Sequence, residues 1–121
     1  MNIFRVAFVV ALTAFAASAQ AQRSCADAKT TIELRDCLSA ELELADKKME
    51  EYLKAAQVSV DEIKGSTNAN TVDLSVAQKI WERYRSAHCG DVYVFWIGGS
   101  IRYEQSLRCQ IALTQERTHT L

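Results

Sequence analysis

The chain has no proline and only four glycines in its 121 residues, and this shortage constrains the fold more than any other feature. Proline and glycine form most tight turns, so a fold of many short strands is disfavoured. Long segments without these residues suit helices. The sequence therefore predicts an all-α protein.

The first 21 residues have the pattern of a secretory signal peptide. One early cation, Arg5, precedes an apolar run, and small residues close the segment in two overlapping A-x-A patterns that end at Ala19 and Ala21. The run of about twelve residues is shorter than the roughly twenty that a membrane-spanning helix needs. A large cation just before Cys25 does not suit a lipid-attachment signal. We therefore expect a periplasmic or secreted protein whose mature part, residues 22–121, is a single domain without a membrane span.

The mature part is close to neutral. Its 13 basic and 15 acidic side chains give a formal net charge of −2. This balance does not favour nucleic acid or a membrane surface as a partner. A domain of this size has a thin core, so covalent cross-links would help to stabilise it.

All four cysteines lie in the mature part and predict two disulfide bonds. Cys25, Cys37, Cys89 and Cys109 form an even set in a small exported chain. A zinc site is the alternative, supported by His88 beside Cys89, but no C-x2-C pair is present. We expect disulfides and neither a metal nor another cofactor.

Two of the three helical segments have clear beginnings. A T-x-x-E capping box, Thr30 to Glu33, starts a helix that we expect to run to the high fifties, with a frayed end towards Lys64. Ser100 is a suitable N-cap for a helix over residues 101–118. Apolar residues lie on two faces of that last helix, so it should contact two partners.

The helix between these two follows a cap at Thr71 or Asp73. It is expected to end at Cys89, because Gly90 easily adopts the left-handed conformation that terminates helices. Three helices joined by connections of about ten residues predict a small, disulfide-stapled antiparallel three-helix bundle.

The bundle geometry suggests how the cysteines pair. Cys37 and Cys109 would lie about 9 and 12 Å above the starts of the first and third helices, and thus at similar heights. Cys25 and Cys89 would both lie at the same end of the bundle. We expect Cys25–Cys89 and Cys37–Cys109, with Cys25–Cys109 and Cys37–Cys89 as the alternative.

The segment DVYVFWIGGS, residues 91–100, is unusually apolar. A strand is disfavoured because no second strand is available to pair with it. An irregular or partly helical connection whose side chains close the core is one interpretation. The other is a rigid binding element, with Asp91, Tyr93, Phe95 and Trp96 as candidate partner-binding residues.

No catalytic arrangement is evident in the sequence. Only His88 and His119 could act as a base near neutral pH, and the first falls on a predicted packing face while the second is near the terminus. Paired carboxylates such as Glu50 and Glu51 diverge by roughly 100° on a helix. We therefore expect no catalytic residues and a protein that is not an enzyme.

The chain resembles the LprI-type lysozyme-inhibitor domain. The resemblance is carried by the segments CADAKTTIELRDC, ADKKMEEYLKA, LSVAQKIWERYRSAHC and GGSIRYEQSLRCQIALTQER. It departs from the family pattern at Glu50 and Ser86. The resemblance implies an exported, disulfide-bonded helical protein and supplies no catalytic residues. We expect Gln78, Trp81 and Arg85 to pack and hydrogen-bond within the bundle rather than to form a shared binding site.

Two functions from different classes follow. One is an inhibitor that blocks lysozyme or a related cell-wall hydrolase by protein–protein contact, for which an exposed and acidic 91–100 segment is expected. The other is a structural or stress-linked envelope protein that binds a different partner, for which a buried segment and mixed surface charge are expected.

The predicted signal peptide can be tested by determining the first residue of the mature protein. N-terminal sequencing of protein from the cell envelope should give Gln22 as the first residue, or Gln20 if the earlier A-x-A site is used. An intact Met1, or a lipid on Cys25, would contradict this expectation.

Overall fold

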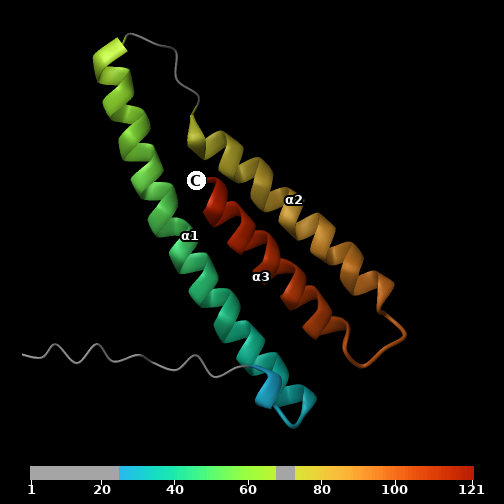
Figure 1. Ribbon diagram of the computed structural model, residues 1–121. Helices are drawn as coiled ribbons and strands as arrows, with labels where there is room; N and C mark the ends of the chain where they lie inside the picture. Colours follow the sequence, from blue (N-terminus) through green and yellow to red (C-terminus); the bar gives the residue numbers. More distant parts are fainter. Residues whose placement is uncertain (1–24, 68–72) are drawn as a thin grey trace, which may run out of the picture.

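The protein is an antiparallel bundle of three helices in the residues that the computed structural model describes, 25–67 and 73–121. They contain a short 3-10 turn, η1 (Cys25–Asp27), the helices α1 (Thr31–Thr67), α2 (Leu74–Phe95) and α3 (Arg102–Thr120), and no strand. Successive helices run in opposite directions (Figure 1). The predicted fold class is confirmed, whereas the signal peptide and the alternative cap Thr71 lie outside the described residues.

Helix α3 lies between α1 and α2 and packs against both (Figure 1). Its buried residues are Glu104, Ile111, Thr114 and Thr118, at the spacings of three, four and seven that place side chains on one helix face. The prediction that the last helix contacts two partners is confirmed. The outer helices α1 and α2 are therefore held together mainly by their contacts with α3.

Helix α1 begins as predicted and runs further than predicted. The Thr30 hydroxyl accepts a hydrogen bond from the Glu33 amide at 3.1 Å, and the Glu33 carboxylate accepts one from the Lys29 amide at 2.9 Å. With 37 residues the helix is about 55 Å long, against about 28 Å for the 19 residues of α3. Its second half therefore extends past the end of α3 (Figure 1).

Helix α2 starts at the predicted cap but does not end at Cys89. The Asp73 carboxylate accepts a hydrogen bond from the Ser75 amide at 2.8 Å. The helix then passes through Gly90 to Phe95. A glycine inside a helix costs about 1 kcal/mol, and the extra turn offsets this by placing Tyr93 against α3.

The unusual segment 91–100 is thus half helix and half turn, and a strand is excluded there. Hydrogen bonds from Trp96 N to Val92 O and from Gly99 N to Trp96 O, at 3.2 and 2.8 Å, close the helix end and the turn. The first residue of α3 is Arg102, and the predicted N-cap Ser100 does not cap it, because Ile101 occupies that position without a side-chain bond.

The core is small and partly polar. Leu38 and Ile111 are its main buried apolar side chains, and Leu34, Leu42 and Leu107 pack around them. Buried Glu104, Thr114 and Gln78 share the interior with these residues. A core of this composition depends on hydrogen bonds and ion pairs as well as on apolar burial.

The disulfides join neighbouring segments, so both expected pairings are wrong. The bonds are Cys25–Cys37 and Cys89–Cys109. The η1 turn folds back beside the first turns of α1, which brings Cys25 to Cys37. Because α2 continues to Phe95, Cys89 lies level with Cys109 on the antiparallel α3 instead of at the bundle end. The bundle is unaffected, but α1 has no covalent link to α2 or α3 within the described residues.

Replacing both Cys89 and Cys109 with serine should lower the free energy of unfolding by about 2–4 kcal/mol, because this bridge closes a loop of 20 residues between two helices. Replacing Cys25 and Cys37 should cost less, since that bridge fastens only the short η1 turn. Urea denaturation of both variants measures the difference. A non-reducing peptide map that links Cys25 to Cys89 or to Cys109 would contradict the pairing.

Candidate functional site

The candidate partner-binding residues lie where α2 passes into α3. Phe95 is 82% exposed and Trp96 is 40% exposed, and their rings meet edge to face at 5.8 Å. Neither ring closes the core, so the outward-facing interpretation holds for these two residues. Asp91 and Tyr93 are two positions apart on the helix, so their side chains diverge by about 200° and do not form one group.

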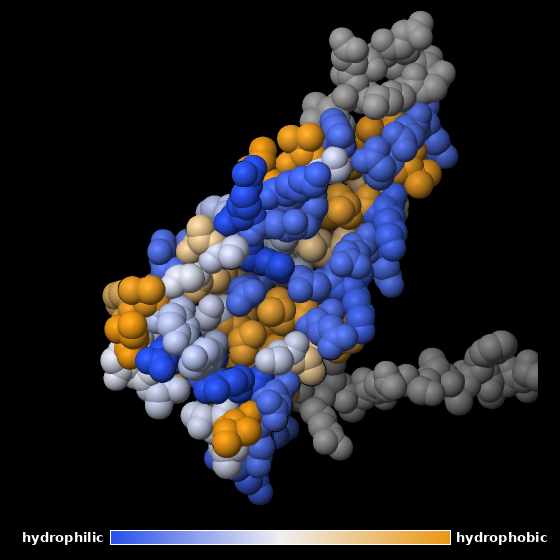
Figure 2. Space-filling model, turned by 180° about the vertical axis from the view of Figure 1, so that it is seen from behind, coloured by the Kyte–Doolittle hydropathy of each residue, from blue (hydrophilic) through white to orange (hydrophobic). Residues whose placement is uncertain are grey.

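Apolar side chains gather at this end of the molecule. Val94 and Ile97 are also exposed, at 60% and 59%. Figure 2 shows an apolar cluster at the left edge, which is the end where α2 joins α3. We call residues 93–97 together with Arg102 and Tyr103 the aromatic end. Exposed apolar clusters on small proteins often mark interaction sites.

A second aromatic pair at the aromatic end joins α2 to α3. The rings of Tyr93 and Tyr103 meet edge to face at 5.0 Å. The Arg35 guanidinium lies 4.4 Å from the Tyr103 ring centre, and the Arg102 guanidinium lies 5.4 Å from the centres of both rings. The sequence did not predict that Tyr103, Arg35 and Arg102 lie at this site, because their proximity depends on tertiary packing.

The two phenols have opposite pKa shifts. The interaction between the two hydroxyls raises the pKa of Tyr93 and lowers the pKa of Tyr103. The positive charges of Arg102 and Arg35 further lower the pKa of Tyr103. The Tyr103 oxygen therefore lies in a region of positive potential.

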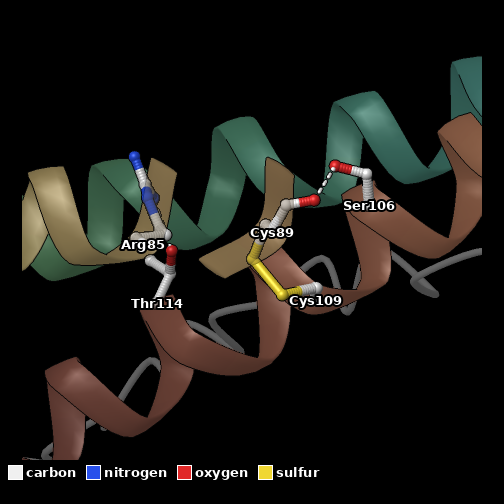
Figure 3. The surroundings of a disulfide bond; sticks show 5 residues. All are labelled: Arg85, Cys89, Ser106, Cys109 and Thr114. Atoms are coloured by element: carbon white, nitrogen blue, oxygen red, sulfur yellow. Dashed lines mark hydrogen bonds between the residues drawn. A yellow bond between two sulfur atoms is a disulfide. The ribbon is translucent and has the colours of Figure 1, made fainter. Parts of the chain in front are cut away.

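The aromatic end is fastened to the bundle. The Cys89–Cys109 bridge joins α2 to α3, and the Ser106 hydroxyl donates a hydrogen bond of 3.0 Å to the Cys89 carbonyl beside it (Figure 3). In the turn itself, Arg102 donates a bond of 3.2 Å to the Ile97 carbonyl. A fastened element loses less conformational entropy when it binds a partner.

A polar network in the middle of the bundle connects all three helices. The Arg85 guanidinium on α2 donates to Asp46 on α1 at 2.5 Å and to Thr114 on α3 at 2.6 Å. It also lies 4.9 Å from the ring centre of Trp81. Nearby, Arg117 donates a bond of 3.1 Å to Gln78. The expectation that Gln78, Trp81 and Arg85 pack and hydrogen-bond within the bundle is confirmed.

A second ion pair ties the start of α1 to α3. Glu104 is 1% exposed, and one of its oxygens accepts hydrogen bonds from Arg35 Nε and Nη2 at 3.2 and 3.1 Å. Burial of a carboxylate is costly unless a cation compensates it. Arg35 therefore pairs with Glu104, and the negative charge of Glu104 largely offsets the positive charge of Arg35.

A groove of about 310 Å³ lies between α1 and α3. Its walls include Leu44, Tyr52, Lys48 and His119. His88 is elsewhere, exposed and stacked on Tyr84 at 5.5 Å. The described part of the chain contains no group of three or more histidine, cysteine or acidic side chains that could hold a metal ion. None of its helices is long and apolar enough to cross a membrane.

The fold and the site define a small disulfide-bonded helical protein with a fastened, exposed aromatic end. The model of the family described as "Lysozyme inhibitor LprI" matches residues 21–121, and the chain belongs to this family. Comparison with curated proteins and with solved structures gives no match. Several positions that carry the sequence resemblance lie in the central network, namely Asp46, Gln78, Trp81, Thr114 and Arg117.

Proposed function

We propose that this protein is exported and inhibits a lysozyme or a related cell-wall hydrolase by direct contact through the aromatic end. Its membership of a lysozyme-inhibitor family supports the class of function. The signal-peptide pattern of residues 1–21 supports export, and two disulfides are usual in exported proteins. The protein then acts by binding, without chemistry of its own.

One observation carries the choice of surface: Phe95 projects almost fully into solvent beside Trp96, at the end of a disulfide-linked helical hairpin. Exposure of such rings is unfavourable in water and is relieved when a partner covers them. A projecting end suits a concave surface, and hydrolases that cleave polysaccharides bind their substrates in clefts. Large aromatic side chains are also the residues that most often dominate interface energies.

The charge of this surface differs from the acidic surface expected of an inhibitor. Asp91 is exposed but points away from Tyr93, and Arg35 and Arg102 lie on the tyrosine side. A net charge of −2 over the mature chain also provides little long-range attraction to a basic partner. The contact we propose therefore depends on aromatic packing more than on an acidic surface.

The alternative is an envelope protein whose aromatic end binds a different partner. Mixed surface charge favours this alternative; for example, Lys47 pairs with Glu43 at 2.8 Å on the exposed face of α1. Such exposed pairs contribute little to stability or to attraction. The exposure of Phe95 and Trp96 favours binding in either case and does not itself identify the partner.

The mutation test separates binding from folding. Phe95→Ala and Trp96→Ala should each weaken inhibition of a lysozyme about thirtyfold or more, because truncating an aromatic at an interface centre costs about 2 kcal/mol. The melting temperature of the Phe95 variant should stay unchanged, since its ring is 82% exposed. Lysozyme activity and thermal unfolding are measured on the same samples.

The matched control is Ile80→Ala, which removes an apolar side chain that is 55% exposed on α2, away from the aromatic end. It should leave inhibition unchanged. The proposal fails for this protein if the wild-type chain leaves lysozymes fully active at micromolar concentration. It also fails if Ile80→Ala weakens inhibition as much as Phe95→Ala does.

A further inference from the structure

Arg102 holds a fixed position at the aromatic end. It is the first residue of α3, and its Nη1 donates a bond of 3.2 Å to the Ile97 carbonyl. The guanidinium lies 5.4 Å from the ring centres of Tyr93 and Tyr103. The side chain is half-buried, so it is ordered by its neighbours yet still reaches solvent.

The charge of Arg102 is not neutralised by the protein. Arg35 pairs with the buried Glu104, whereas Arg102 forms no ion pair with any residue in the two described segments. The lowered pKa of Tyr103, caused first by the hydroxyl of Tyr93 and next by the charge of Arg102, agrees with positive potential here. The aromatic end thus combines apolar rings with one unpaired guanidinium.

The position of Arg102 is also unfavourable for the helix. The backbone dipole makes a helix N-terminus positive, so a cation in the first turn is disfavoured. Arg102 nevertheless occupies the first position of α3, where it donates a hydrogen bond to the carbonyl of exposed Ile97. Inside the protein Arg102 contacts a carbonyl oxygen and two aromatic rings but no carboxylate, so a role outside the protein is a candidate reason for its position.

We propose that Arg102 recognises a carboxylate of the partner hydrolase, and that it determines specificity for enzymes whose cleft carries the paired carboxylates of glycoside hydrolysis. This inference rests on the proposed function and adds the chemistry of recognition. Arginine binds a carboxylate through two parallel hydrogen bonds, and surrounding rings that exclude water strengthen such a pair. Glycoside hydrolases carry an ionised catalytic carboxylate in the open cleft, and Arg102 would pair with this group.

In this arrangement the aromatic rings and the guanidinium have separate roles. Phe95 and Trp96 cover the apolar walls of the cleft, and Arg102 pairs with the carboxylate at its base. The Tyr93 and Tyr103 rings keep the guanidinium in place through their contacts at 5.4 Å. The surface is therefore suited to an acidic cleft even when the enzyme as a whole is basic.

The test compares four inhibitors against one lysozyme: wild type, Arg102→Gln, Arg102→Lys and Arg108→Gln. Arg102→Gln should raise the inhibition constant about tenfold to a hundredfold, as expected for a lost hydrogen-bonded charge pair. Arg102→Lys should restore part of the loss, because lysine keeps the charge but not the paired geometry. Arg108 is exposed on α3, about 140° around the helix from Tyr103, and its variant should inhibit like wild type.

A second experiment identifies the carboxylate of the lysozyme that pairs with Arg102. Binding of wild type and Arg102→Gln is measured by calorimetry on a lysozyme whose ionised cleft carboxylate is replaced by the amide. The two inhibitors should then bind equally, because the partner group of Arg102 is gone. Equal inhibition by wild type and Arg102→Gln on the normal enzyme, or an undiminished difference on the amide enzyme, would overturn the inference.

The outcomes also separate this inference from the proposed function. If wild type binds lysozyme and Phe95→Ala weakens binding while Arg102→Gln does not, only the role of Arg102 is refuted. If wild type does not bind lysozyme at all, the proposed function fails and the inference fails with it. Circular dichroism of Arg102→Gln shows whether the variant keeps its helices.

Discussion

The contact between Arg85 and its two oxygen partners is the interaction on which the rest of the structure depends. Arg85 reaches from α2 to Asp46 on α1 and to Thr114 on α3, so a single guanidinium connects the three helices. Neither disulfide does this, because both join segments that are already neighbours. The apolar core is also small, with Leu38 and Ile111 as its main members. The position of α1 against the α2–α3 pair therefore depends on polar contacts as well as on the apolar packing of α1 against α3.

Much of the fold follows from the sequence, and one error, the expected end of α2, led to another. The capping box at Thr30, the cap at Asp73 and the apolar spacing were sufficient to predict three antiparallel helices. Gly90 was expected to end α2, since glycine favours helix ends, but packing of Tyr93 against Tyr103 outweighs that local preference. Because the end of α2 was misplaced, Cys89 was expected at the end of the bundle and not level with Cys109, its true partner. The Cys25–Cys37 bond was missed for a different reason, because η1 folds back beside α1.

The candidate site was predictable in part for a similar reason. The run of apolar residues identified Phe95 and Trp96 as candidates, and both are exposed in the structure. The sequence did not predict that Asp91 and Tyr93 point in different directions, because that conclusion requires knowing that residues 91–95 are helical. Arg102 and Arg35 reach the site only through the packing of α3 on α1 and α2. Periodicity of apolar residues likewise missed buried Glu104, since polar side chains are not counted in such a pattern, and buried Gln78 was expected only through the family resemblance.

A double-mutant cycle on Asp46 and Arg85 tests the central claim that this contact holds α1 to the other helices. Urea denaturation is measured for wild type, Asp46→Asn, Arg85→Met and the double variant. Methionine keeps an unbranched apolar side chain at this position while removing the guanidinium. A coupling free energy of about 1–3 kcal/mol is predicted, with the double variant less destabilised than the sum of the singles. Additive effects, within about 0.5 kcal/mol, would contradict the account.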